Sequence, residues 1–330
     1  MKIAVLGAGA WGTAVAIAAT ERHQTVLWSR DPAHYDALAR ERENRRYLPG
    51  ITLPPGLAIS RHFADALAGA ELAILAVPTA GLRAALGQLA QQAGGLGIIW
   101  LCKGFESGSM LLPHQVFGQV LAGHPRGAVL SGPSFADEVA RGLPAAVTLA
   151  SFDAAFAAEA AQVLHNRRLR IYSSDDVAGV EIGGAVKNVI AIAAGVCDGL
   201  KLGNSARAAL ITRGLAEITR LGLRMGGRLE TFMGLSGVGD LSLTCTSDLS
   251  RNRRVGLSLA AGTALNDTLA GLGHVAEGVN TAKEVWRLAQ QLGVDMPITH
   301  AITRVLAGEW SPREAVDELL QREPKPERVG

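Results

Sequence analysis

Short apolar runs alternate with longer, helix-length segments along the first half of the chain. The runs are rich in β-branched residues and end at Gly, Pro or small polar residues, which is typical of buried strands. Their alternation with helices predicts a doubly wound, mainly parallel sheet up to about residue 174. The predicted strands are 2–6, 25–28, 57–60, 72–77, 97–101, 128–130, 145–150 and 169–173, and the predicted helices among them include 65–68, 82–92 and 153–164.

A charged segment interrupts this alternation at residues 40–46, which read RERENRR. Three prolines follow it, Pro49, Pro54 and Pro55. Because a charge run is usually solvated and proline interrupts regular hydrogen bonding, we predict the end of a solvated helix followed by a loop.

The second half of the chain shows no convincing strand pattern. Its periodicity predicts an all-helical C-terminal domain over residues 175–321, after an N-terminal α/β domain over residues 1–174. The tail 322–330 is polar and broken by proline, so we expect it to be disordered. The predicted helices of the second domain are 177–200, 205–221, 251–261, 281–292, 297–307 and 312–320.

Composition narrows the class of protein. The 32 basic and 30 acidic side chains leave a net charge of +2, without the basic excess typical of proteins that bind nucleic acid. The three cysteines, Cys102, Cys197 and Cys245, are far apart and lack the spacing of a metal site, which suits reduced thiols. The N-terminus has no signal-peptide layout, and no run approaches the roughly 18 apolar residues of a membrane span. We therefore expect a cytoplasmic protein with no metal, no nucleic acid and no integral membrane association.

A glycine-rich turn follows the first predicted strand and opens a helix that continues through residue 19. It reads Gly7-Ala8-Gly9-Ala10-Trp11-Gly12, which is the G-x-G-x-x-G pattern with both of its expected flanks. In such a turn Gly7 makes the tight bend, Gly9 lets a pyrophosphate approach the backbone, and Gly12 lets the helix pack on the strand. The pattern predicts a Rossmann-type dinucleotide site, the alternative being a glycine-rich turn without a ligand.

The end of the second predicted strand bears on the choice of cofactor. NAD enzymes usually place an acid there for the ribose 2′-hydroxyl, whereas an arginine accommodates the 2′-phosphate of NADP. Here Ser29 and Arg30 come first, and Asp31 follows one position later. We therefore expect NADP(H) to be preferred and NAD(H) to be possible, unless Arg30 is simply a solvated loop residue.

Lys187 lies at the centre of the apolar segment 181–196, which reads EIGGAVKNVIAIAAGV and contains no proline. Burying a charged amine without a partner is costly, so the lysine must reach solvent or be held by other groups. Gly183, Gly184, Ala191 and Ala194 share or border its face of the predicted helix and form a shallow groove. The groove favours close approach of another molecule or backbone, and close helix–helix packing beside a solvent-reaching lysine is the alternative.

Other polar residues stand where ligands commonly bind. Lys103 follows the predicted strand 97–101, at the ligand-facing edge of such sheets, which favours contact with a substrate phosphate or carbonyl; a solvated loop lysine is the alternative. The small turn 131–136 (SGPSFA) follows another strand and could approach a polar ligand closely. Asp240 would share a helical face with Thr244 if a helix begins there, and a helix cap is its alternative role.

The segment Ser250-Arg251-Asn252 offers a hydroxyl, a guanidinium and an amide in sequence. If Ser250 caps the following helix, the helix N-terminus and the arginine form an anion site. Arg251 could instead be one of several solvated arginines.

Seven short segments then carry a resemblance that covers nearly the whole chain: GAGAWGTA at 7–14, CKG at 102–104, SGPSFA at 131–136, GAVKNVIA at 184–191, GDL at 239–241, SRN at 250–252 and AEG at 276–278. Together they resemble, in the same order, the bacterial NAD(P)-dependent glycerol-3-phosphate dehydrogenases. The segment around Lys187 is the most specific of them, because many dehydrogenases share the glycine turn.

The resemblance implies reversible reduction of dihydroxyacetone phosphate to sn-glycerol 3-phosphate, for glycerophospholipid synthesis. It implies that Lys187 is the catalytic acid and base, acting with Asp240 and Lys103. The implied substrate contacts are Lys103, Gly132, Ser134, Lys187, Asp240, Ser250, Arg251 and Asn252. The implied cofactor contacts, with the glycine turn included, are Gly7, Gly9, Ala10, Trp11, Gly12, Arg30, Lys103, Ala136, Arg251, Val275 and Glu277.

The residues support the same chemistry independently, since hydride delivery to a ketone places negative charge on its oxygen and calls for a nearby proton donor. Burial and a second cation such as Lys103 could lower the pKa of Lys187 to suit that task. Two alternatives stay open, namely a reductase of keto acids with the same architecture and a nucleotide-sensing protein without catalysis. An apolar helical domain also favours a homodimer.

Overall fold

The structure is a computed structural model that describes residues 1–91, 94–272 and 276–323. Its contacts divide the chain into two units. The sheet unit consists of Met1–Cys102 and Pro113–Val177, and the helical unit consists of Lys103–Leu112 and the chain from Ala178 onward. The short segment Lys103–Leu112 thus packs with residues far away in sequence, because Phe105 and Leu112 belong to the hydrophobic core of the helical unit.

Eight strands form the sheet in the order β10-β9-β8-β7-β6-β1-β2-β5. All neighbouring strands are parallel except β8 and β9. The chain leaves β1 toward β2 on one side and returns to β6 on the other, so the strand order reverses between β1 and β6. A ligand binds at such a switch point in doubly wound folds. The strands are β1 (Lys2–Leu6), β2 (Gln24–Trp28), β5 (Leu57–Ser60), β6 (Leu72–Leu75), β7 (Gly97–Trp100), β8 (Gly127–Ser131), β9 (Ala145–Ala150) and β10 (Leu169–Ser174), which confirms the predicted sheet.

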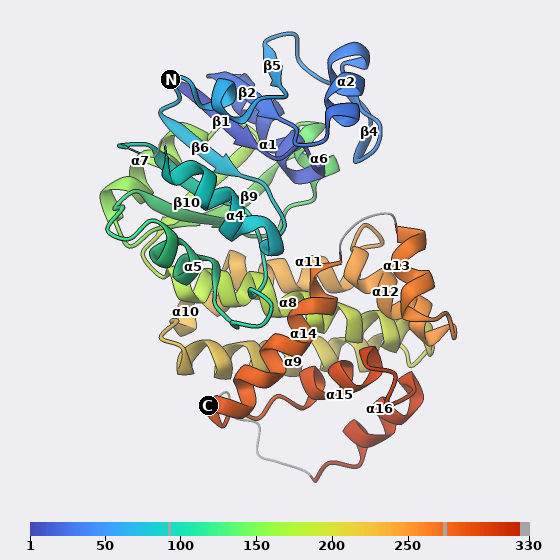
Figure 1. Ribbon diagram of the computed structural model, residues 1–330. Helices are drawn as coiled ribbons and strands as arrows, with labels where there is room; N and C mark the ends of the chain where they lie inside the picture. The colour runs from blue at the N-terminus through green and yellow to red at the C-terminus, as the bar shows by residue number, and fades with distance from the viewer. Residues whose placement is uncertain (92–93, 273–275, 324–330) are drawn as a thin grey trace. The chain divides into compact units, whose positions relative to one another are not determined.

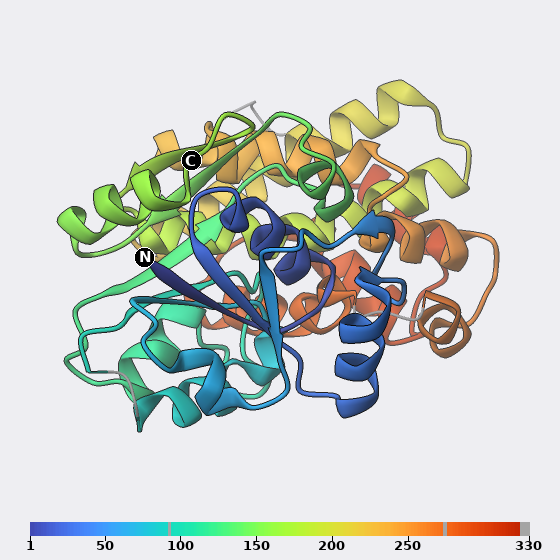
Figure 2. The same ribbon diagram turned by 90° about the horizontal axis from the view of Figure 1, so that it is seen from above.

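Helices flank this sheet (Figures 1 and 2). The crossovers β1–α1–β2 and β6–α4–β7 run in opposite directions from the switch point, and right-handed connections therefore place α1 and α4 on opposite faces. In agreement, α1 contacts α6 while α4 contacts α5. The helices are α1 (Ala10–Thr20), α2 (Pro32–Glu41), α3 (Phe63–Leu67), α4 (Thr79–Ala90), α5 (Pro113–Val120), α6 (Ala136–Ala140) and α7 (Ala154–Leu164).

The segment after α2 differs from its prediction as a solvated helix end and loop. The helix ends at Glu41, and Arg42 adopts a left-handed conformation with φ of 51°. A small antiparallel hairpin follows, formed by β3 (Glu43–Asn44) and β4 (Leu48–Thr52). The prediction was wrong because one polar residue in this charged run is fully buried: Asn44 is 0% exposed and bonds to the glycine turn.

The described residues of the helical unit contain no strand, which confirms the predicted all-helical C-terminal part. Its centre is α8, whose apolar residues form one core with side chains of the surrounding helices (Figure 1). Length and composition alone would let α8 cross a membrane, contrary to our reading of the sequence, but its most apolar window is entirely buried inside the protein. The elements are α8 (Val177–Gly199), α9 (Asn204–Arg224), α10 (Leu229–Phe232), the π-helical turn η1 (Leu235–Gly239), α11 (Asp240–Thr246), α12 (Arg251–Ala260), α13 (Leu265–Leu272), α14 (Glu277–Leu292), α15 (Pro297–Leu306) and α16 (Pro312–Leu320).

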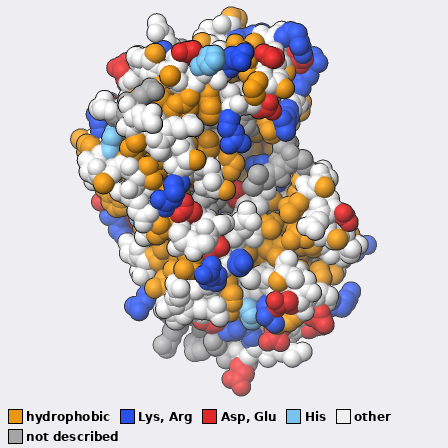
Figure 3. Space-filling model, viewed as in Figure 1, with side chains coloured by type: hydrophobic (Ala, Val, Ile, Leu, Met, Phe, Trp, Pro, Cys, Tyr) orange, Lys and Arg blue, Asp and Glu red, His pale blue; other side chains and the backbone are white. Residues whose placement is uncertain are grey.

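Charged side chains of both signs are interspersed over the face shown in Figure 3. Exposed ion pairs occur along the chain, and one of them joins Arg322, just after α16, to Asp295 at 3.0 Å. Residues 324–330 of the predicted tail lie outside the described part of the chain.

Candidate active site

A single carboxylate joins two lysines inside the helical unit. Lys187 projects from the middle of α8 and is 6% exposed, and its Nζ lies 2.5 Å from Oδ1 of Asp240. The other oxygen of Asp240 accepts a hydrogen bond from Nζ of Lys103 at 2.8 Å. The same Lys187 amine donates to Oγ1 of Thr244 at 2.9 Å. Lys187 and Lys103 are thus both held by partners, and neither is a freely solvated lysine.

Burial controls the proton affinity of Lys187. It lowers the pKa of the amine to about 8, because desolvation opposes the charged form more strongly than Asp240 supports it. The positive charge of Lys103 lowers the pKa of Lys187 further. An amine with a pKa in this range can give up or accept a proton near neutral pH, which is what general acid–base catalysis requires.

The backbone around Gly183 explains how Asp240 reaches Lys187. A Cβ at Gly183 would overlap the carbonyl oxygen of Ser236, so glycine lets η1 lie directly on α8. The turn then leads into α11, which begins at Asp240. Asp240 is therefore a residue of the first helical turn, and Gly239 is the N-cap. The backbone of η1 therefore occupies the groove beside Gly183, which agrees with the interpretation of this groove as a site of close packing within the protein.

The start of α12 matches the predicted cap. Oγ of Ser250 accepts a hydrogen bond from the backbone N–H of Arg253 at 3.2 Å, which confirms Ser250 as the N-cap. Arg251, at the first helical position, is exposed. First-turn amides, the positive end of the helix dipole and a guanidinium therefore occur together at this helix start.

The side chain of Asn252 joins three helices of the helical unit. It is 8% exposed, its Nδ2 donates to Oδ1 of Asn188 at 2.9 Å, and its Oδ1 accepts from the backbone N–H of Gly278 at 3.0 Å. Asn188 follows Lys187 directly, and Gly278 follows Glu277 at the start of α14. The amide of Asn252 thus links α8, which carries Lys187, to α14, which begins at the candidate cofactor contact Glu277. Val275, a predicted cofactor contact, lies outside the described residues.

An ion pair that the sequence analysis missed fixes α12 against α8. The guanidinium of Arg253 lies 2.8 Å from a carboxylate oxygen of Asp198, and both side chains are largely buried. Buried groups of opposite charge stabilise each other strongly only when they are paired and hydrogen-bonded. No local sequence signal distinguishes Arg253 from its neighbours Arg251 and Arg254, since only the fold brings Asp198 close.

In the sheet unit, the glycine turn has the geometry that its pattern predicts. Gly7 has φ of +129°, where other residues are strained, and a Cβ there would overlap the carbonyl oxygen of Ala76. A Cβ at Gly12 would overlap the carbonyl oxygen of Gly7, so α1 can approach the turn only with glycine at this position. Gly9 has open space beside it. The turn, followed by Ala10 and Trp11 at the start of α1, fits a dinucleotide pyrophosphate.

Two side chains that the sequence analysis missed hold this turn. The carbonyl oxygen of Ala8 lies 3.0 Å from Nδ2 of Asn44 and 3.1 Å from Nε2 of His34, and both side chains are buried. Asn44 also donates to Oγ1 of Thr13 at 2.7 Å. These contacts orient the peptide between Ala8 and Gly9, the part of the turn that faces a bound phosphate in Rossmann folds.

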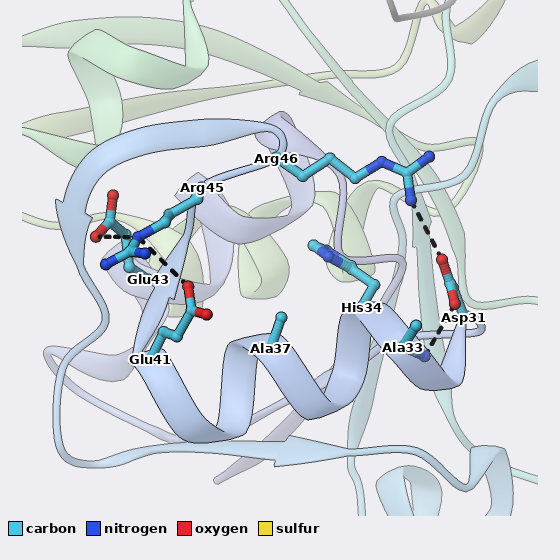
Figure 4. Close-up of a pocket in the computed structure, with 8 residues that line it drawn as sticks. All are labelled: Asp31, Ala33, His34, Ala37, Glu41, Glu43, Arg45 and Arg46. Atoms are coloured by element: carbon cyan, nitrogen blue, oxygen red, sulfur yellow. Dashed lines mark hydrogen bonds and ion pairs between the residues drawn. The ribbon is translucent and has the colours of Figure 1, made fainter.

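Arg30 and Asp31 follow β2 as the cofactor prediction requires. Arg30 is exposed and forms no hydrogen bond or ion pair with any other described residue. Asp31 is the N-cap of α2 and accepts a hydrogen bond from the backbone N–H of Ala33 at 3.0 Å. A cavity of about 260 Å³ opens here between α2 and the hairpin (Figure 4).

The turn after β8 holds the other predicted contacts in the sheet unit. Gly132 has φ of +139° and is buried, and Oγ of Ser134 donates to its carbonyl oxygen at 3.2 Å. Ala136 begins the short helix α6. Among the described residues no cluster of three or more His, Cys, Asp or Glu side chains is arranged to hold a metal ion.

A sheet unit with a dinucleotide-type glycine turn and a helical unit with a buried lysine of lowered pKa are together typical of a nicotinamide-dependent dehydrogenase. Comparison with known proteins narrows this class. The family model described as NAD-dependent glycerol-3-phosphate dehydrogenase N-terminus matches residues 2–157, and the model described as the C-terminus of the same enzyme matches residues 176–317. The chain therefore belongs to the NAD-dependent glycerol-3-phosphate dehydrogenases, which are NAD(P)-dependent oxidoreductases acting on a CH–OH group.

Individual relatives agree with this assignment. A glycerol-3-phosphate dehydrogenase (NAD(P)+) of Dechloromonas aromatica is 58% identical over 327 residues, which cover 99% of each chain. One of Nitrosospira multiformis is 57% identical over 331 aligned positions, again 99% of each chain. The crystal structure of the glycerol-3-phosphate dehydrogenase of Coxiella burnetii matches with a TM-score of 0.93 at 42% identity, covering 97% of this chain and 99% of that one.

Proposed function

We propose that this chain catalyses the reversible interconversion of dihydroxyacetone phosphate and sn-glycerol 3-phosphate with NAD(P)(H). The arrangement of Lys187 and Lys103 around the buried carboxylate of Asp240 is the observation that carries the proposal. Family membership supports the substrate, since the relatives that match the full chain are named for it.

Lys187 supplies the proton in this proposal. A bound nicotinamide supplies the hydride to the ketone carbon. As that carbon accepts the hydride, its oxygen becomes negative and takes a proton from the Lys187 ammonium group, which gives the alcohol and a neutral amine. In the reverse direction the neutral amine removes the hydroxyl proton. Asp240 and Thr244 orient the amine, since both accept its hydrogen bonds.

The phosphate of the substrate is bound by Arg251 and the N-terminus of α12 in this account. The first turn of α12 provides backbone amides that need partners from outside the helix, and the exposed guanidinium next to Ser250 provides charge. Binding energy from the phosphate, which does not react, positions the carbonyl for reaction. We also assign Gly132, Ser134 and Lys103 as contacts of this substrate. Asn252, in the first turn of α12, is assigned to the phosphate site.

We assign the cofactor to the glycine turn and to Arg30, with NADP(H) preferred over NAD(H). Arg30 is exposed directly after β2 and bonds to no other residue that the structure describes, which suits a 2′-phosphate. Ala136, Arg251, Glu277 and Lys103 are assigned as further cofactor contacts.

We also place the enzyme in the cytoplasm as a homodimer that supplies glycerophospholipid synthesis. All three cysteines are buried and none of them forms a disulfide, which suits a reducing compartment. Several large apolar side chains of the helical unit are exposed, among them Leu202, Leu223 and Met233, and this supports self-association. Light scattering of the purified chain tests the dimer, and a mass of one chain would contradict it.

Substrate profiling tests the proposed function. The purified enzyme should oxidise NADPH rapidly with dihydroxyacetone phosphate and far more slowly with keto acids such as ketopantoate or glyoxylate. Arg251→Ala should raise the KM for dihydroxyacetone phosphate about tenfold or more, while Arg254→Ala, an exposed arginine on the same helix, should not. Turnover of keto acids only would show that the chain uses the same chemistry on another substrate.

A further inference from the structure

Both oxygens of Asp31 are engaged. Oδ1 accepts the capping hydrogen bond from Ala33, and Oδ2 lies 3.2 Å from Nη1 of Arg46 (Figure 4). Asp31 is the first acid after β2, where an acid ordinarily binds the ribose 2′-hydroxyl of NAD. In this protein that acid already has a cationic partner.

The hairpin brings Arg46 to this position. Asn44, buried and bonded to Ala8 and Thr13, anchors the hairpin to the glycine turn. Arg46 follows two residues later and extends along the rim of the cavity toward Asp31 (Figure 4). The adjacent Arg45 pairs instead with Glu41 and Glu43, at 3.3 and 3.4 Å. The two neighbouring arginines therefore serve different acids.

The pair changes the charge that a cofactor would meet. A free carboxylate here repels a 2′-phosphate and accepts a hydrogen bond from a 2′-hydroxyl, so it favours NAD(H). Once Arg46 neutralises Asp31, the exposed Arg30 becomes the dominant charge after β2. Because the Asp31 and Arg46 side chains are 49% and 58% exposed, the pair adds little to stability. It can therefore be broken without unfolding the protein.

We propose that Arg46 is a specificity-determining residue that selects NADP(H) by pairing with Asp31 and keeping this acid from the ribose. This inference rests on the proposed function, in that the chain binds a nicotinamide dinucleotide. It assigns to Arg46 an indirect role, whereas Arg30 contacts the 2′-phosphate itself.

A double-mutant cycle tests the pairing. The ratio of kcat/KM for NADPH to that for NADH is measured for the wild type, Arg46→Ala, Asp31→Asn and the double variant. Asparagine caps helices as well as aspartate, so α2 remains capped in Asp31→Asn. Arg46→Ala should lower the ratio about tenfold, because the freed carboxylate repels the phosphate. Adding Asp31→Asn should restore most of the loss. Arg45→Ala is the matched control and should leave the ratio within about twofold of the wild type.

Three results would overturn the inference. They are an unchanged ratio in Arg46→Ala, an equal loss in Arg45→Ala, or a loss in Arg46→Ala that Asp31→Asn fails to restore. The last would mean that Arg46 contacts the phosphate directly. Titrating NADPH and NADH into each variant, followed by tryptophan fluorescence, gives the same ratio from dissociation constants. The pairing is thus tested even if the wild type reduces no dihydroxyacetone phosphate, a result that would count against the proposed function alone.

Discussion

Lys187 and Asp240 form an ion pair of 2.5 Å in which both side chains are almost completely buried. Removing one partner of a buried pair usually leaves an uncompensated charge and destabilises the fold strongly. Here the carboxylate keeps a second partner, because Lys103 lies 2.8 Å from its other oxygen. Lys187 can therefore be replaced while Asp240 stays paired, so its chemical role can be separated from its contribution to folding.

Asp240→Asn should move the pH dependence of ketone reduction toward lower pH. Reduction needs protonated Lys187, so its rate falls as pH rises through the pKa of the amine, about 8. Asp240 raises this pKa, and removing its charge leaves burial and Lys103, which both lower it. We expect kcat to decline at a pH lower by about one unit or more. Steady-state kcat between pH 6 and 10 measures the shift.

Asp267→Asn is the control for that experiment, since Asp267 is an exposed acid on α13 of the same unit. Its pH profile should match the wild type. A profile of Asp240→Asn that stays in place, or moves to higher pH, would contradict the assigned electrostatics.

Gly183→Ala should disturb the active site through the backbone. The added methyl group would overlap the carbonyl of Ser236, so η1 and the following Asp240 must move away from α8. Overpacking of this kind costs about 1–3 kcal/mol of unfolding free energy. We expect a lower midpoint in urea unfolding together with a fall in kcat.

Gly87→Ala provides the matched control. Gly87 lies on the exposed side of α4, and apart from its chain neighbours and the helix's own backbone no described atom lies within 4 Å of an added Cβ. Alanine there should stabilise the helix by about 0.4–1 kcal/mol. Equal effects of the two substitutions would show that η1 does not depend on Gly183.

Glu217 should make stability depend on pH. It is 1% exposed, and burial raises the pKa of its carboxyl to about 7, against hydrogen bonds from Ile298 and Thr299 that lower it. The folded pKa lies above the unfolded one, so the stabilising contribution is full below about pH 4.5 and is lost as pH rises through 7. The unfolding free energy of the neutral variant Glu217→Gln, relative to that of the wild type, should therefore rise by on the order of 3 kcal/mol between pH 5 and pH 8. Urea unfolding of both proteins at these two pH values measures the gain. A difference independent of pH would contradict a neutral Glu217 in the folded state.

Local patterns in the sequence predict much of this structure. The strands and the glycine turn follow from β-branched runs and from a motif whose residues are neighbours, and α8 follows from one long apolar segment. Lys187 stands out because a lone cation in such a segment needs partners. These features depend on residues close together in the chain.

The sequence does not predict contacts between distant segments. The hairpin after α2 exists because Asn44 bonds to Ala8, 36 positions earlier, and within RERENRR nothing marks Asn44 as buried. The bonds of Asn252 to Asn188 and Gly278 likewise span 64 and 26 positions. Periodicity describes one element at a time, so it does not show which polar side chain of one element forms a hydrogen bond with another element.

A single-turnover experiment with Lys187→Ala tests the central claim most directly. Enzyme saturated with NADPH is mixed with dihydroxyacetone phosphate, and cofactor oxidation is followed by absorbance, with Lys283→Ala, an exposed lysine on α14, as control. We expect Lys187→Ala to bind NADPH within about twofold of the wild type and to oxidise it about 10²–10⁴ times more slowly, because the proton donor is gone. Lys283→Ala should behave like the wild type. Oxidation by folded Lys187→Ala at nearly the wild-type rate would contradict the role of Lys187 as the proton donor.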